Sequence, residues 1–404
     1  MELFGQIVIC IIMACAVVGA VVSIIKEEHP LGKKFLEGID SIGPIFLPVA
    51  GILAAAPFLT TFVTSAFGPL YETVGADAAM AATTIIATDM GGYQLAEAIA
   101  ATKESWIMAM TTGYMAGATI IFSIPVALKM LEKRDRKYLA LGVMSGMLAI
   151  PVGVFIAGAV IALMDPSIRE VIATNGAATY ELALSFGLIF RNLIPLIIFC
   201  VAIAVGLLLI PNGMIRGFLV FGKVMDSALR LIVVFSIVEY FTGFFSVVIG
   251  HWGFDPIIAD ETEPFRALET AGYIGIMLCG AFPMVYMIQT YLKRPLNALG
   301  RRIGLSADAT TGILAATANI LALFAIVRDM APEDKVKCIA YGVCSAFLIG
   351  DHLSFTANFQ PTLILPVMIG KFLGGCLAVF LAMKIAVPRA RILAEKEAAV
   401  SETD

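Results

Sequence analysis

Long apolar blocks alternate with short charged loops along most of the chain. Five of these blocks run from Gly5 to Ile25, Ile45 to Phe67, Trp106 to Leu128, Leu139 to Met164 and Ala271 to Leu292. Each is long enough, at about 20 residues or more, for a helix to cross roughly 30 Å of hydrocarbon. The pattern therefore predicts an all-α polytopic membrane protein.

Two blocks, 78–102 and 307–328, differ from the others because Thr, Asp or Asn and glycine interrupt them. If both blocks crossed the membrane, Lys and Arg would divide almost evenly between its two sides. If both are re-entrant hairpins, 21 of these residues lie inside and 3 outside, as the positive-inside rule requires. We therefore predict nine spanning helices and two re-entrant helical hairpins, with the N-terminus outside and the C-terminus cytoplasmic. Each limb of about 12 residues would reach about 18 Å, near the bilayer midplane.

A weak internal repeat has the order span, hairpin, broken span, span. Landmarks recur between its copies, such as Pro69 against Pro295 and Gly113 against Gly342. The charges of the loops place the two copies on opposite faces, which indicates an inverted-repeat, elevator-like transporter. The predicted parts are 1–44 (first span and basic inner loop), 45–164 (first repeat), 165–270 (connecting scaffold spans), 271–387 (second repeat) and 388–404 (cytoplasmic tail).

Composition narrows the class further. Hydrophobic residues make up 60% of the 404 residues and charged residues 14%, with a mean hydropathy of +0.94. Soluble enzymes, disulfide-stabilised secreted domains and nucleic-acid binders are excluded. The seven cysteines lack metal-ligand spacing, and no catalytic motif of soluble enzymes occurs. We expect no enzyme activity, no catalytic residues, no metal and no cofactor.

The tip of the first hairpin carries an acid, Asp89, between Thr88 and the pair Gly91 and Gly92. A carboxylate at the midplane costs about 3 kcal/mol even on insertion scales, so it is a candidate for substrate binding. Paired glycines let the backbone approach a ligand closely. The structural alternative is that Asp89 caps the second limb of the hairpin.

The second hairpin and the broken spans supply the other candidates. Asn319 lies at the second tip, where it could bind a polar ligand or form an ordinary turn. The span after the first hairpin is interrupted at Ser123 and Pro125, and Gly280 to Met284 breaks the eighth span. The span after the second hairpin carries the remaining candidates, which are Asp351, His352 and Ser354.

The two acids Asp89 and Asp351, one in each repeat, suit a small cation. Alternatively, Asp351 forms a structural ion pair with His352 or Lys371. Two ionised acids close together would repel each other. We therefore expect unequal roles, with Asp89 binding the cation, alone or in a site it shares with Asp351, while Asp351 and His352 orient the broken helix.

Several segments resemble the ethanolamine permease family, the membrane transport proteins of bacterial ethanolamine utilisation. They are Thr88 to Gly92, Thr119 to Leu128, Arg136 to Gly142, Gly280 to Met284 and Gly350 to Leu353. The resemblance covers nearly the whole chain and implies an inner-membrane carrier that supplies ethanolamine to a cytosolic ammonia-lyase. Thr88 stands where the family pattern has cysteine, and Asn319 is single where a pair is expected.

Together these observations predict uptake of protonated ethanolamine by alternating access, as a uniport driven by the gradient and the membrane potential. A carboxylate would bind the ammonium, and Asn319, Ser123 or Ser354 would bind the hydroxyl. The alternative is a sodium- or proton-coupled carrier of another small polar solute. The expected partners are the substrate, the bilayer and a second copy of the chain in a homodimer, with no nucleic acid.

Overall fold

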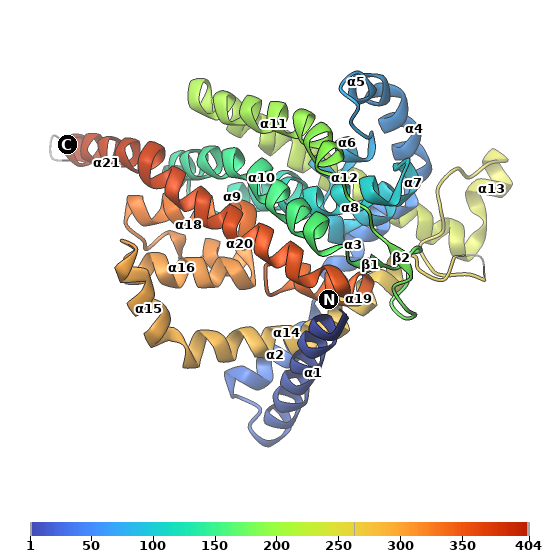
Figure 1. Cartoon of the computed structure of the whole chain (residues 1–404), viewed down its shortest axis with the longest axis horizontal. Coiled ribbons are helices and arrows are strands. Elements are labelled where there is room, and N and C mark those ends of the chain that lie inside the picture. Colours follow the sequence, from blue (N-terminus) through green and yellow to red (C-terminus); the bar gives the residue numbers. More distant parts are fainter. Residues whose placement is uncertain (1, 262, 402–404) are drawn as a thin grey trace.

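The computed structural model describes residues 2–261 and 263–401, and helices account for most of them (Figure 1). The N-terminal part contains α1 (Glu2–Ile25), α2 (Pro30–Asp40), α3 (Ile42–Ala54), α4 (Ala56–Ala66), α5 (Gly68–Glu72), α6 (Ala79–Ile85), η1 (Thr88–Met90), α7 (Gly92–Ile99), α8 (Lys103–Thr112), η2 (Gly113–Ser123), α9 (Ile124–Met130), η3 (Lys133–Asp135) and α10 (Arg136–Met164).

The middle of the chain contains β1 (Ser167–Ile168), β2 (Tyr180–Glu181), α11 (Phe186–Leu209), α12 (Pro211–Thr242) and α13 (Phe244–Ile249). The C-terminal part contains α14 (Ala267–Tyr291), α15 (Lys293–Arg302), α16 (Ala307–Ala318), α17 (Ile320–Val327), α18 (Pro332–Ser345), α19 (Asp351–Phe359), η4 (Pro361–Leu363), α20 (Ile364–Leu381), η5 (Ala382–Ala386) and α21 (Val387–Ser401). Strands β1 and β2 form a small antiparallel pair that the sequence pattern did not predict.

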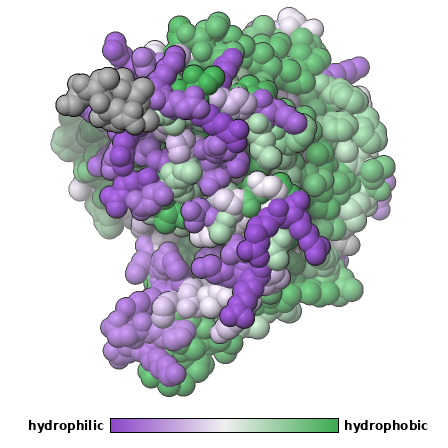
Figure 2. All heavy atoms as spheres, turned by 90° about the vertical axis from the view of Figure 1, so that its left-hand side faces the viewer, coloured by the Kyte–Doolittle hydropathy of each residue, from purple (hydrophilic) through white to green (hydrophobic). Residues whose placement is uncertain are grey.

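Seven helical stretches of the described chain are long and apolar enough to cross a membrane. They are Glu2–Ile25, Pro30–Ala54, Lys103–Met130, Lys133–Met164, Phe186–Leu209, Ala267–Tyr291 and Pro361–Glu397. Figure 2 shows hydrophilic residues gathered on the left-hand side of Figure 1, where α15 and α21 lie. The chain is thus an all-α polytopic membrane protein, and the number of nine spans stays a prediction.

Both predicted hairpins are pairs of short helices that pack against each other, α6 with α7 and α16 with α17. Residues 86–91 separate the first pair, and Gly91 there adopts a φ of +92°, which favours glycine. Asn319 alone separates the second pair, with an extended φ of −156°. The limbs α6 and α7 have only 7 and 8 residues, shorter than predicted, because the connection between them takes up six residues.

The spans that follow the hairpins are interrupted in different ways. After the first hairpin, the helix continues as a π-helix over Gly113–Ser123 (η2), and Pro125 lies in the first turn of α9. After the second, the helix stops between Ser345 and Asp351, where Phe347 has a φ of +60°. The predicted break at Gly280 to Met284 is wrong, because α14 continues through Pro283 as one helix.

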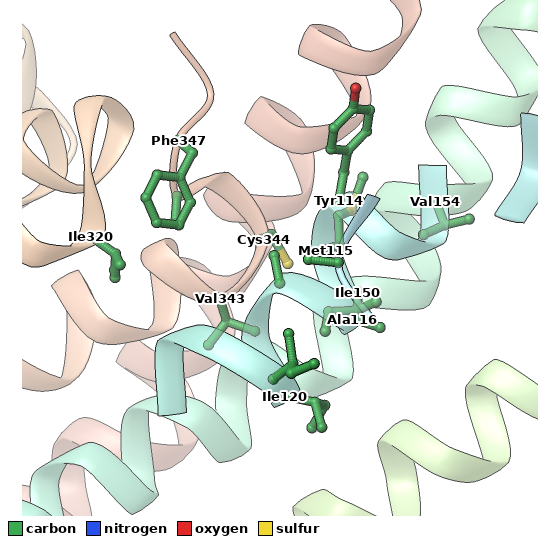
Figure 3. Close-up of a cluster of buried hydrophobic side chains, with 14 of the residues drawn as sticks. Tyr114, Met115, Ala116, Ile120, Ile150, Val154, Ile320, Val343, Cys344 and Phe347 are labelled. Atoms are coloured by element: carbon green, nitrogen blue, oxygen red, sulfur yellow. The ribbon is translucent and has the colours of Figure 1, made fainter. Parts of the chain in front are cut away.

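Part of the core lies where η2 packs against α6, α10 and α18. Figure 3 shows side chains of η2, among them Met115 and Ile120, close to Ile150 of α10 and Val343 of α18. Helices α10 and α20 pack so closely that a Cβ added at Gly370 would lie 2.6 Å from Ala157 Cβ. Small residues let membrane helices approach in this way, so these helices hold the broken segments in place.

Candidate functional site

A cavity of about 280 Å³ lies between the two hairpin tips, the broken helix before α19, and helices α2 and α3. Its lining residues are Glu37, Asp40, Ser41, Pro44, Ile45, Pro48, Ala87, Asp89, Met90, Ala118, Phe122, Phe282, Asn319, Leu321, Phe347, Asp351 and His352. Four of them are acids, and none is Lys or Arg. Such a lining favours a small cation over an anion.

Two acids and a histidine form the polar end of the cavity. His352 Nε2 lies 3.6 Å from Asp89 Oδ1, a distance beyond hydrogen-bond range. Within the described part of the chain, Asp89 Oδ1, Asp351 Oδ1 and both ring nitrogens of His352 are buried without a hydrogen-bond partner. Buried polar groups are normally paired, so these atoms are available to a ligand.

Close backbone packing positions the tip that carries Asp89. The Thr88 hydroxyl donates to the carbonyl oxygen of Met110 at 2.7 Å. A Cβ added at Gly113 would lie 2.4 Å from Thr88 Oγ1, and one at Gly117 would lie 2.2 Å from the carbonyl oxygen of Ile86. The tip can rest on this helix only because glycine occupies both positions.

The second tip is held against the broken helix by main-chain hydrogen bonds. Phe347 N donates to Ala316 O and Ile349 N donates to Thr317 O, each at 3.1 Å. Gly350 lies so close to Ala318 that a Cβ would be 2.2 Å from its carbonyl oxygen. These contacts place Asp351 in the first turn of α19, where the positive end of the helix dipole favours a carboxylate.

Asn319 caps a helix and also lies in the cavity lining. Its Oδ1 accepts a 2.8 Å hydrogen bond from Leu321 N and so caps α17. The residue also lines the cavity. Because the cap uses only the oxygen, the amide nitrogen can still donate to a ligand.

The structure brings together Asp89, Asn319, Asp351 and His352, but it leaves the other five candidates outside the cavity lining. Thr88 is fully buried, Gly91 packs on Ile52, and Gly92 packs on the Ala87 carbonyl. The Ser123 hydroxyl donates to Ala118 O at 3.1 Å. Ser354 is buried, and its hydroxyl has no partner among the described residues.

Neither a cap from Asp89 nor an ion pair of Asp351 with His352 or Lys371 occurs among the described residues. The acid close to His352 is Asp89, at 3.6 Å. Helix α7 has no side-chain cap from Asp89. Lys371 does not pair with Asp351, and its Nζ instead donates to the carbonyl oxygens of Tyr114 at 2.7 Å and Cys344 at 2.8 Å. Both acids therefore remain available inside the cavity.

Sequence analysis missed the mouth of the cavity. Glu37 and Asp40 lie on α2, which was expected to belong to a basic inner loop. Their three-residue spacing puts both on one face of a helix, a signal that could have been used. Glu37 also pairs with the exposed Lys34, so Asp40 is the less compensated of the two. The four acids of the lining thus lie at both ends of the cavity, two at the mouth on α2 and two at the polar end.

Apolar helices around a cavity that has acids at one end and interrupted helices in its wall are typical of polytopic helical membrane transport proteins. Comparison with known sequences gives the family. Residues 4–385 match the family described as ethanolamine utilisation protein, EutH, and the chain belongs to that family.

Relatives cover nearly the full length of this chain. A probable ethanolamine permease EutH from Listeria monocytogenes is 35% identical over 95% of this chain and 94% of its own. Proteins of the same description from Escherichia coli and Salmonella typhimurium are 35% and 36% identical, over 94% and 92% of this chain and 91% and 90% of their own. No solved structure matches the chain. Since these relatives are named as permeases, the protein is a membrane transport protein and not an enzyme.

Proposed function

We propose that the protein carries protonated ethanolamine into the cell by alternating access, as a uniport. One observation carries the proposal: two buried carboxylate oxygens, of Asp89 and Asp351, accept no hydrogen bond within the described chain and belong to a cavity lined by four acids and no Lys or Arg. An ammonium ion satisfies such oxygens with charge-assisted hydrogen bonds. The names of the relatives supply the identity of the amine.

Each end of the substrate then has a partner. The ammonium group pairs with Asp89, and Asp351 and His352 lie beside it at the same end of the cavity. The free amide nitrogen of Asn319 donates to the hydroxyl oxygen. Met90, Phe122 and the other apolar lining residues contact the two carbons, and they offer little to a larger polar solute.

The proposal includes the membrane arrangement expected from the sequence, with nine spans, two re-entrant hairpins and inverted repeats. Equivalent glycines support it. Gly113 faces Thr88 at the first tip, and Gly342 faces Ile320 at the second. The acidic mouth at α2 follows the basic stretch Lys26 to Lys34, which by the charge rule lies inside. We therefore propose that the cavity opens toward the cytoplasm of a bacterial inner-membrane protein.

Uptake into proteoliposomes tests the function. Labelled ethanolamine should enter saturably, with and without sodium, and unlabelled ethanolamine should compete at least tenfold better than choline, alanine or nucleosides. Because the cavity holds four acids, an excess of neutral solute should have little effect. Stronger competition by alanine or a nucleoside, or an absolute need for sodium or a proton gradient, would favour a coupled carrier of another solute. Linear, non-saturating flux would indicate a channel. The homodimer stays a prediction. It can be tested by measuring the mass of the solubilised particle with the bound detergent subtracted, which should equal two chains.

A further inference from the structure

Lys371 is a buried cation that the proposed substrate site does not use. It lies on α20 with only 1% of its surface exposed. Its Nζ donates to the carbonyl oxygen of Tyr114 at 2.7 Å and to that of Cys344 at 2.8 Å. No carboxylate of the described chain lies within 4.0 Å of this nitrogen. An unpaired buried ammonium is costly and calls for an explanation.

The two carbonyl groups belong to the two interrupted helices. Tyr114 lies in the π-helix η2, and Cys344 lies in the last turn of α18, just before the chain breaks (Figure 3). Because the helix stops there, Leu348 N donates to Ser345 O and leaves the Cys344 carbonyl free of its usual partner. In secondary transporters, carbonyl groups of unwound helices are typical ligands of a coupling sodium ion or proton.

At the polar end of the cavity, the charges of the two ionised acids and the substrate balance only if Lys371 is counted. Asp89 and Asp351 contribute two negative charges near the polar end. One lysine and one monovalent cationic substrate bring the sum to zero. Without the lysine, the same two acids would require a second cation together with the substrate.

We propose that the Lys371 ammonium occupies the position that a coupling cation would otherwise take, so that transport proceeds without sodium. Lys371 is then a positioning residue: it holds the broken helices of the two halves together and supplies a fixed positive charge. A hydrogen bond to the main chain of Lys371 helps to fix its place, since the Ser345 hydroxyl donates to Lys371 O at 2.6 Å. The inference rests on the proposed transport of a cationic amine and adds the reason for its independence from sodium.

Initial ethanolamine uptake in NaCl and in KCl tests this assignment. The wild type should have equal rates in both salts. The initial uptake rate of Lys371→Met should be at least tenfold below that of the wild type in KCl. Its rate in NaCl should be severalfold higher than in KCl, because sodium can occupy the vacated position. The double variant Lys371→Met with Asp351→Asn restores the charge balance, so its rate should exceed that of Lys371→Met in KCl. A purely structural lysine would not produce this compensation.

The chain offers a matched control in Lys337, another buried lysine, which pairs with Asp334 at 3.0 Å away from the cavity. Lys337→Met should show equal rates in the two salts, whatever its expression level. If Lys371→Met does not fold, Lys371→Gln, whose amide keeps two donors without the charge, replaces it. A sodium requirement in the wild type overturns the inference. So do wild-type rates in folded Lys371→Met in KCl, or equal inactivity of the single and double variants in both salts. Absence of ethanolamine uptake by the wild type would instead refute the proposed function.

Discussion

Replacing Asp89 by asparagine removes one negative charge from the polar end of the cavity while keeping the size of the side chain. The Asp89 side chain is 14% exposed, and His352 Nε2 lies 3.6 Å from its Oδ1. An ammonium at about 4 Å from this carboxylate gains about 4 kcal/mol at an effective dielectric constant of 20. Since 1.4 kcal/mol corresponds to a tenfold change, we expect ethanolamine to bind Asp89→Asn roughly a thousandfold more weakly.

Isothermal titration of the purified protein with ethanolamine measures this loss. Asp351→Asn should weaken binding far less or slow turnover, because this acid is expected to orient α19. Asp308→Asn is the matched control: this exposed acid lies in the first turn of α16, outside the cavity lining, and should leave the affinity unchanged. Near-native affinity in Asp89→Asn with none in Asp351→Asn would mean that the two roles are reversed. Unchanged affinity in both variants would refute a carboxylate-bound cation.

Three further predictions concern the scaffold. Gly350→Ala should reduce both uptake and the melting temperature, because its Cβ would meet a carbonyl oxygen of the second hairpin at 2.2 Å; overpacking of this kind costs about 1–3 kcal/mol, and an unchanged melting curve would contradict the packing. Lys335→Met should destabilise the protein by about 3–5 kcal/mol in denaturant titrations, because it leaves the buried Asp135, now paired at 2.6 Å, without a partner. Cysteines replacing Ala101 and Asp329 should react with a membrane-impermeant maleimide from outside and from inside, respectively, and labelling of either from the opposite face would refute the two-hairpin topology.

Four of the five apolar blocks could be located from the sequence because each block is a nearly independent signal. The span predicted from Ile45 to Phe67 is wrong: the chain breaks at Ala55 between α3 and α4, and the stretch long and apolar enough to cross a membrane is Pro30–Ala54. Polar residues and glycine inside two blocks were enough to locate both helix pairs, with tips close to Asp89 and Asn319. The π-helix could not be predicted, because its register depends on contacts between distant segments. One of these is the approach of Gly117 to the Ile86 carbonyl.

The same limit decided which site residues could be found. An acid at a helix break has a local signal, so Asp89 and Asp351 stood out, as did His352 beside the latter. Ser123 did not reach the cavity lining, because the π-helix aims its hydroxyl at Ala118 O. Glu37 was missed because its role depends on how α2 packs against distant helices, which no local pattern encodes.

The most direct test of the account is the accumulation of ethanolamine in proteoliposomes that hold an inside-negative potential and no sodium or proton gradient. One positive charge gains about 2.3 kcal/mol per 100 mV, so a uniporter of the protonated amine should accumulate it about fifty-fold at 100 mV. The initial rate should saturate with concentration, and preloaded ethanolamine should drive counterflow. Accumulation that does not depend on the membrane potential, or that appears only when a sodium or proton gradient is added, would contradict the uniport of a cation.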